Sequence, residues 1–121
     1  MSDFIPAPIK PTVTIADLDK LDIGVGMIET VECIAGSEKL VRLTVDFGDR
    51  RRSVLASLRN ERAEPQAEIE GRQALFVVNL APRKMAGHVS EAMLFDIGYA
   101  DGITPVLAVP ERPIPNGARG G

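Results

Sequence analysis

Cysteine, histidine and tryptophan are almost absent from this chain of 121 residues, which has one cysteine, one histidine and no tryptophan. A single cysteine cannot form an internal disulfide, and this suits a reducing compartment. Cys33 lies among alternating apolar residues, which predicts a small buried hydrophobe. With only Cys33 and His88 available, a zinc site would need carboxylates for nearly all of its ligands, so we expect no metal and no cofactor.

Long hydrophobic runs and catalytic patterns are missing as well. The start of the chain has no basic segment followed by an apolar one, and no run approaches the roughly 18 apolar residues of a membrane span. We therefore expect a soluble, cytoplasmic protein without membrane contact. His88, Ser90 and Glu91 are close in sequence, whereas a catalytic triad normally draws its members from separate segments. The sequence therefore predicts a protein that is not an enzyme and has no catalytic residues.

Aromatic residues are few, with one tyrosine and four phenylalanines. Phe47, Phe76 and Phe95 fall in apolar strand patterns, so few rings remain to stack on bases, a contact worth about 1–3 kcal/mol for each base. If the chain binds RNA, this composition favours recognition of a folded RNA through its shape and backbone.

Charge is distributed unevenly along a chain whose net charge is −3. Residues 39–84 contain ten Lys or Arg and six Asp or Glu, which gives +4, and the rest of the chain carries −7. This asymmetry indicates a surface that faces a polyanion, although solvated charged faces have a similar composition.

Apolar residues mostly alternate, which is the period of β-strands with one buried face. Alternation predicts a strand at residues 39–47, and the turn at residues 48–49 predicts a returning strand at 51–58. Residues 21–34 are a β-rich segment, residues 74–78 are an apolar run typical of a buried strand, and residues 92–99 and 103–110 are two further candidate strands. Pro65 and Gly71 bound a short helix between the third and fourth strands, and Thr14 is a candidate N-cap for another helix.

This order of elements predicts an all-β fold, a five-stranded barrel of the oligonucleotide/oligosaccharide-binding (OB) type with a short helix between strands 3 and 4. Both ends are rich in proline and glycine and are expected to form extended N- and C-terminal arms. Residues 1–17 are the N-terminal arm in this prediction, and residues 18–119 are the barrel domain.

The segment NLAPRKMAGHVSEAM at residues 79–93 is the candidate binding loop. Pro82 stiffens the loop just before Arg83 and Lys84, so these two cations lose less entropy on meeting a phosphate. Asn79 and Ser90 add neutral groups able to reach a phosphate or a 2′-hydroxyl. A structural interpretation fits equally well, in which Asn79 caps a strand end and the two cations are ordinary solvated charges.

Four segments carry a resemblance to a known family: LDIGVGMI at 21–28, EKLVRLTVDFG at 38–48, NLAPRKMAGHVSEAML at 79–94 and IPNGAR at 114–119. With them the chain resembles the tRNA-binding domain family, which includes free-standing tRNA-binding proteins, CsaA-type proteins and a domain appended to methionyl-tRNA synthetases. The resemblance implies an OB barrel without catalytic residues. It also implies a homodimer built with the terminal extensions, including the C-terminal part from about residue 105.

The resemblance further implies a set of RNA-binding residues, matched by position. They are Asn79, Arg83, Lys84, Ser90, Met93 and Ser57. The family commonly has a basic residue where this chain has Gly24, Met27 and Ala86. Candidates to compensate for these losses are Arg59 and the arginines at 50–52.

The sequence thus predicts non-catalytic binding of tRNA or tRNA-like structured RNA by a homodimer, with an aminoacyl-tRNA synthetase as a further candidate partner. One alternative is a CsaA-type chaperone that binds unfolded or export-bound polypeptide in an apolar groove, where Met27 and Met85 would adapt to varied partners. Another is a module that has lost its RNA affinity and only self-associates.

Overall fold

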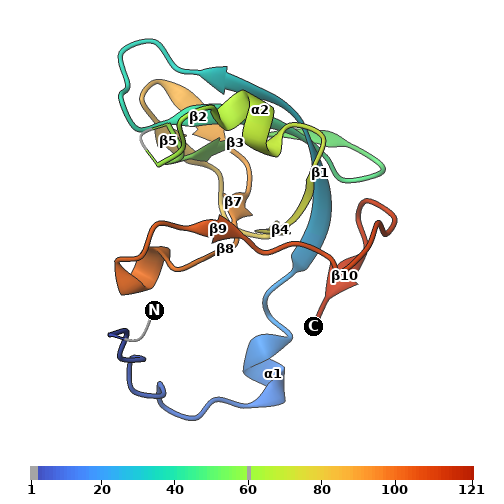
Figure 1. The fold of residues 1–121 in the computed structure, drawn as a ribbon. Coiled ribbons are helices and arrows are strands. Elements are labelled where there is room, and N and C mark those ends of the chain that lie inside the picture. Colours follow the sequence, from blue (N-terminus) through green and yellow to red (C-terminus); the bar gives the residue numbers. More distant parts are fainter. Residues whose placement is uncertain (1–2, 60) are drawn as a thin grey trace.

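The structure is a computed structural model that describes residues 3–59 and 61–121, so residues 1–2 of the predicted N-terminal arm lie outside the described residues. No helix in this part of the chain is long and apolar enough to cross a membrane. The elements, in chain order (Figure 1), are α1 (Ile15–Leu18), β1 (Ile23–Cys33), β2 (Val41–Asp46), β3 (Arg51–Ala56), α2 (Pro65–Ile69), β4 (Gln73–Val77), β5 (Arg83–Met85), β6 (His88–Ser90), β7 (Met93–Leu94), β8 (Asp96–Ile97), η1 (Tyr99–Asp101), β9 (Val106–Leu107) and β10 (Arg119–Gly120).

One curled sheet forms the barrel, with strand order β3-β2-β1-β4-β7 and antiparallel pairing throughout. β1 pairs with β4 through residues 23–27 and with β2 through residues 27–33, so this one strand serves both halves of the sheet. Gly26 permits the tight curl, because a Cβ at this position would collide with the side chains of Val45 and Phe47. A register shift between Ile28 and Thr30 adds a β-bulge to the same strand.

The barrel closes between β3 and residues 90–92, a junction that we call the seam. The backbone N–H of Glu91 donates to the Ser53 carbonyl at 2.9 Å. Side chains supply the other bonds, because the Leu55 N–H donates to Ser90 Oγ at 3.0 Å and the Ser53 N–H donates to Glu91 Oε1 at 2.9 Å. The predicted all-β, OB-like barrel is confirmed, and α2 lies between β3 and β4 as expected.

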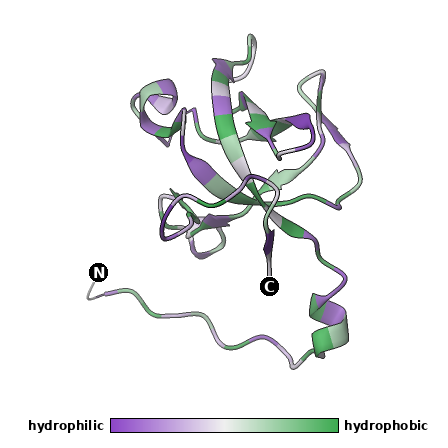
Figure 2. Ribbon diagram, turned by 90° about the vertical axis from the view of Figure 1, so that its right-hand side faces the viewer, coloured by the Kyte–Doolittle hydropathy of each residue, from purple (hydrophilic) through white to green (hydrophobic). Residues whose placement is uncertain are grey.

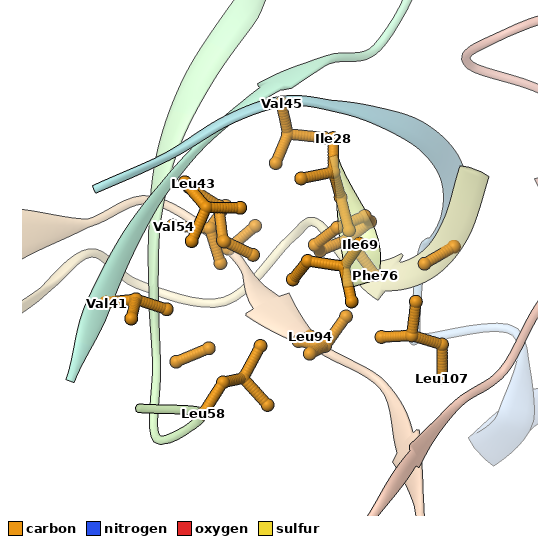
Figure 3. Close-up of a cluster of buried hydrophobic side chains, with 14 of the residues drawn as sticks. Ile28, Val41, Leu43, Val45, Val54, Leu58, Ile69, Phe76, Leu94 and Leu107 are labelled. Atoms are coloured by element: carbon orange, nitrogen blue, oxygen red, sulfur yellow. The ribbon is translucent and has the colours of Figure 1, made fainter. Parts of the chain in front are cut away.

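The core fills the inside of the curled sheet (Figure 3). Ile28, Leu43 and Ile69 are fully buried there, and Ile69 is the contribution of the short helix α2. Phe47 packs edge to face on the fully buried Phe76, with ring centroids 5.3 Å apart and an interplanar angle of 82°. Each such side chain contributes about 1.5–3 kcal/mol by leaving water, and these contacts hold the barrel together.

The N-terminal arm leaves the barrel. Residues 3–13 form no helix or strand and are exposed, and Figures 1 and 2 show them running outside the barrel. α1 then begins with a complete capping box, in which the Asp17 N–H donates to Thr14 Oγ1 and the Thr14 N–H donates to Asp17 Oδ2, both at 3.2 Å. The N-cap predicted at Thr14 is therefore confirmed.

The C-terminal arm, in contrast, packs on the barrel. β10 pairs with the start of β1, and the Gly117 N–H donates to the Val25 carbonyl at 2.7 Å. Further back, the Ile114 N–H donates to Gln73 Oε1 at 3.1 Å. Gly117 has a φ of +90° and lies directly against the Phe47 carbonyl, where a Cβ would not fit.

Two predictions about apolar residues are wrong. Cys33 is exposed, because it is the last residue of β1 and follows Val31, the last core side chain of that strand. Phe95 is 40% exposed, because residues 92–99 form two short strands and this ring lies between them.

Candidate nucleic-acid interface

The candidate binding loop is a β-hairpin. β5 and β6 pair in the register Arg83 to Ser90, Lys84 to Val89 and Met85 to His88. Two residues connect them, Ala86 with φ +50° and Gly87 with φ +79°, the signs required by a type I′ turn. Backbone pairing therefore stiffens the segment in addition to Pro82. The sequence pattern did not reveal this pairing.

Arg83 and Lys84 are both exposed, and neither forms an ion pair with any residue that the structure describes. Successive side chains on a strand point to opposite faces. Arg83 therefore shares its face with Met85, and Lys84 shares the other face with Val89, which is 49% exposed. The hairpin presents one cation on each side.

Two of the arginines predicted to compensate for the missing basic residues already have carboxylate partners. Arg50 Nη2 lies 2.8 Å from Asp49 Oδ2, and Arg51 Nε lies 2.6 Å from Glu29 Oε1. The hydrogen bond from Arg50 holds the pKa of the Asp49 carboxyl below its ordinary value. These two arginines are therefore less available to a phosphate than the hairpin cations.

Asn79 and Ser90, both predicted to contact RNA, are engaged in holding the fold. Asn79 Nδ2 donates to the Lys20 carbonyl at 2.7 Å, and its Oδ1 accepts from the Asp22 N–H at 2.8 Å, which fixes the entry to β1. Ser90 is buried, and its hydroxyl donates to the Ala92 carbonyl at 2.8 Å while it accepts the hydrogen bond from the Leu55 N–H. Asn79 is exposed and uses only one of its two Nδ2 hydrogens in these bonds, so its contact with RNA stays a prediction. The burial of Ser90 does not favour the contact predicted for that residue.

The remaining predicted residues lie in different places. Arg59 Nη1 donates to the carbonyls of Ile34, at 3.2 Å, and Ser37, so it fastens the loop after β1. Ser57 is half-buried just after β3, and Met93 is 45% exposed on β7. Of these residues, all within the described part of the chain, only Arg59 has a structural role that its hydrogen bonds define.

Sequence reasoning missed a hollow at the open end of the barrel, which we call the barrel mouth. It has a volume of about 460 Å³, and its lining includes Asp22, Gly24, Phe47, Arg52, Asn79 and Arg119. Arg119 Nε donates to Asp22 Oδ1 at 3.0 Å although the two residues are 97 positions apart. The IPNGAR segment at residues 114–119 was the only sequence signal for this hollow. It could not reveal the hollow, because the pairing of its end with β1 joins residues far apart in the chain.

Similarity to known proteins agrees with this architecture. The family model for the tRNA binding domain matches residues 23–119. A MetRS related protein from Pyrococcus horikoshii is similar in structure, with a TM-score of 0.84 and 31% identity over 93% of this chain and 100% of that chain. The chaperone CsaA from Bacillus anthracis gives a TM-score of 0.78 and 25% identity over 92% of this chain and 100% of that one. The C-terminal domain of Plasmodium vivax p43 gives a TM-score of 0.75 and 25% identity, over 85% of this chain and 61% of that chain.

The chain therefore belongs to the tRNA-binding domain family, as the resemblance of its sequence predicted.

Proposed function

We propose that this protein binds tRNA or tRNA-like structured RNA without catalysis, and that the β5–β6 hairpin contacts the phosphate backbone. The observation that carries the proposal is the exposure of Arg83 and Lys84 on a stiff hairpin, with no carboxylate of the described chain opposing either. Cations held in place lose less entropy on binding, and each neutralised phosphate releases counterions. The similar MetRS related protein supports an aminoacyl-tRNA synthetase as a partner, which would place the protein in the cytoplasm.

A homodimer is the assembly that the exposed apolar surface favours. Ile97 of β8 pairs with Val106 of β9, and these side chains are 56% and 53% exposed. Tyr99 follows on η1, and the N-terminal arm adds the exposed Ile5 and Ile9. Apolar patches of this kind usually mark interaction sites. We therefore propose that the N-terminal arm of each copy packs on the β8–β9 surface of the other copy.

Loss of the dimer is expected when either surface is changed. Deleting residues 1–13, or replacing Ile97→Glu, should give monomers by size-exclusion chromatography with light scattering. Val89→Glu alters a comparably exposed apolar residue on the hairpin and should remain dimeric. A wild-type chain that is monomeric at micromolar concentrations would contradict the proposal.

A CsaA-type chaperone is the second candidate function, and one groove favours it. This groove has a volume of about 620 Å³ and lies between the C-terminal arm and residues 71–73, with Met27, Val109 and Ile114 in its lining. Methionine adapts to varied apolar partners, as polypeptide capture requires. Met85 lies instead on β5, where it is half-buried.

Salt dependence separates these functions. Two phosphate contacts give a slope of about −1.8 in log affinity against log salt, so affinity for bulk tRNA should fall roughly tenfold between about 50 and 200 mM salt. Capture of a reduced, unfolded polypeptide in an apolar groove should barely change. Fluorescence titrations of the wild-type protein with both ligands measure this. Self-association without tRNA binding even at low salt would support the assembly module instead.

A further inference from the structure

The barrel mouth offers a second site for an anion, distinct from the exposed cations of the hairpin. We propose that it binds a phosphate group, supplied by the backbone of an RNA seated on the hairpin or by a free nucleotide. That the phosphate belongs to RNA rests on the proposed function. That the mouth binds a phosphate group rests only on the residues that line it.

Gly24 keeps the mouth open. It projects inward from β1, and an added Cβ would meet only Val78 Cγ1 at 3.7 Å and the Ala118 carbonyl at 4.0 Å, which are ordinary contacts. Neither crowding nor a positive φ therefore requires glycine here. The absence of a side chain at Gly24 adds to a hollow of about 460 Å³, within the range of small-ligand sites in the mouths of β-barrels.

The charges around the mouth favour an anion. Its lining contains three arginines and two aspartates, a net charge of +1. Both carboxylates are engaged, because Asp22 accepts from Arg119 Nε at 3.0 Å, and Asp49 accepts from Arg50 Nε at 3.1 Å and Nη2 at 2.8 Å. The terminal amino groups of Arg119 have no partner among residues 3–59 and 61–121, so the hydrogen-bonding capacity left over includes donors suited to phosphate oxygens.

The donors are held in position before any ligand arrives. Arg52 Nη1 donates to the carbonyls of Val78 at 3.2 Å and Glu91 at 3.4 Å, which fixes a half-buried guanidinium without neutralising its charge. Asp22, which orients Arg119, is itself held through its backbone N–H by Asn79. Groups ordered in this way lose little entropy on binding.

The mouth is continuous with the base of the hairpin. The two carbonyls that hold Arg52 belong to Val78 and Glu91, which lie on either side of the hairpin in sequence. A nucleic-acid backbone seated on the hairpin can therefore continue to the mouth. The floor suits a phosphate and not a base, because the Phe47 ring packs on Phe76 and is only 8% exposed.

Two variants test the site by different means. Gly24→Leu places an apolar side chain in the mouth without changing charge, and Arg119→Ala removes a donor. Arg112→Ala is the matched control, because Arg112 is also an exposed arginine of the C-terminal arm paired with a carboxylate. The probes are inorganic phosphate and AMP, followed by NMR amide shifts of Gly24 and Gly117, and bulk tRNA, followed by fluorescence titration.

Saturable shifts with phosphate and AMP are expected in the wild type and in Arg112→Ala, and their loss in Arg119→Ala and Gly24→Leu. Affinity for tRNA should fall about fivefold in the two mouth variants. If Gly24→Leu does not give the NMR spectrum of a folded protein, the results for Arg119→Ala decide whether phosphate binds in the mouth.

The proposal would be overturned if phosphate and AMP caused no NMR shifts and the mouth variants bound tRNA as tightly as the wild type. This holds even if the hairpin proves essential for tRNA binding. An equal loss in Arg112→Ala would also overturn it, because the effect would then be one of overall charge. Saturable phosphate binding that Arg119→Ala abolishes, in a protein that binds no tRNA, would support the mouth as a nucleotide site while the proposed function fails.

Discussion

Replacing Arg83 and Lys84 together with alanine is expected to weaken binding of bulk tRNA at least about tenfold. Each cation is exposed and carries a charge that no described carboxylate neutralises, so each is available to make a charge-assisted contact with a phosphate. The slope of log affinity against log salt should also become shallower, by about 1 for each cation removed. Fluorescence titration at two salt concentrations measures both effects.

The matched control removes one lysine and one arginine from elsewhere on the surface. Lys39→Ala with Arg112→Ala gives the same change in net charge, and both side chains are exposed on segments outside the hairpin. This control should retain most of the affinity. Equal losses in the two double variants would show that only overall charge matters, and would remove the hairpin from the proposed interface while leaving the fold unaffected.

The second large effect is expected at Gly117→Ala, which should destabilise the fold by about 3 kcal/mol or more. Gly117 has a φ of +90°, a conformation that strains an L-residue by about 1–2 kcal/mol. The added Cβ would also strike the Phe47 carbonyl, which is backbone and cannot swing aside. The C-terminal arm would have to move off β1, with loss of the bond from Gly117 to Val25. Urea unfolding measures the change.

Gly102→Ala separates backbone strain from the steric collision. Gly102 has a φ of +71°, but no heavy atom lies within 4 Å of an added Cβ. This variant should therefore lose only the strain energy, about 1 kcal/mol. Equal destabilisation by the two substitutions would mean that the close approach of the arm to the Phe47 carbonyl contributes nothing.

The parts of the fold that sequence could predict are those decided by local patterns. The alternation in residues 39–47 matches β2, because one face of that strand packs on the core. The turn after it correctly predicted the returning strand β3, whose residues 54–56 are all buried. Thr14 and Asp17 form their capping box within one turn of helix. Pro65 begins α2, where its missing N–H is not needed.

The roles of individual polar residues in the candidate site were not predictable in the same way. Asn79 bonds to residues 57 and 59 positions away, and Ser90 bonds to Leu55, 35 positions away. A motif identifies such residues as important, but the direction of their hydrogen bonds depends on which distant segment packs beside them. The sequence therefore placed Arg83 and Lys84 on a stiff segment but gave no indication that Ser90 is buried.

The seam makes the hairpin and the barrel wall parts of one mechanical unit. The β2–β3 and β1–β4 pairs are uninterrupted backbone ladders, whereas at the seam two of the bonds depend on the side chains of Ser90 and Glu91. A junction with so few backbone bonds opens at lower free energy than the ladders beside it. Because β6 ends at Ser90, the seam anchors one leg of the hairpin to the barrel wall. A substitution at Ser90 or Glu91 is therefore expected to loosen the segment that carries Arg83 and Lys84 without altering either cation.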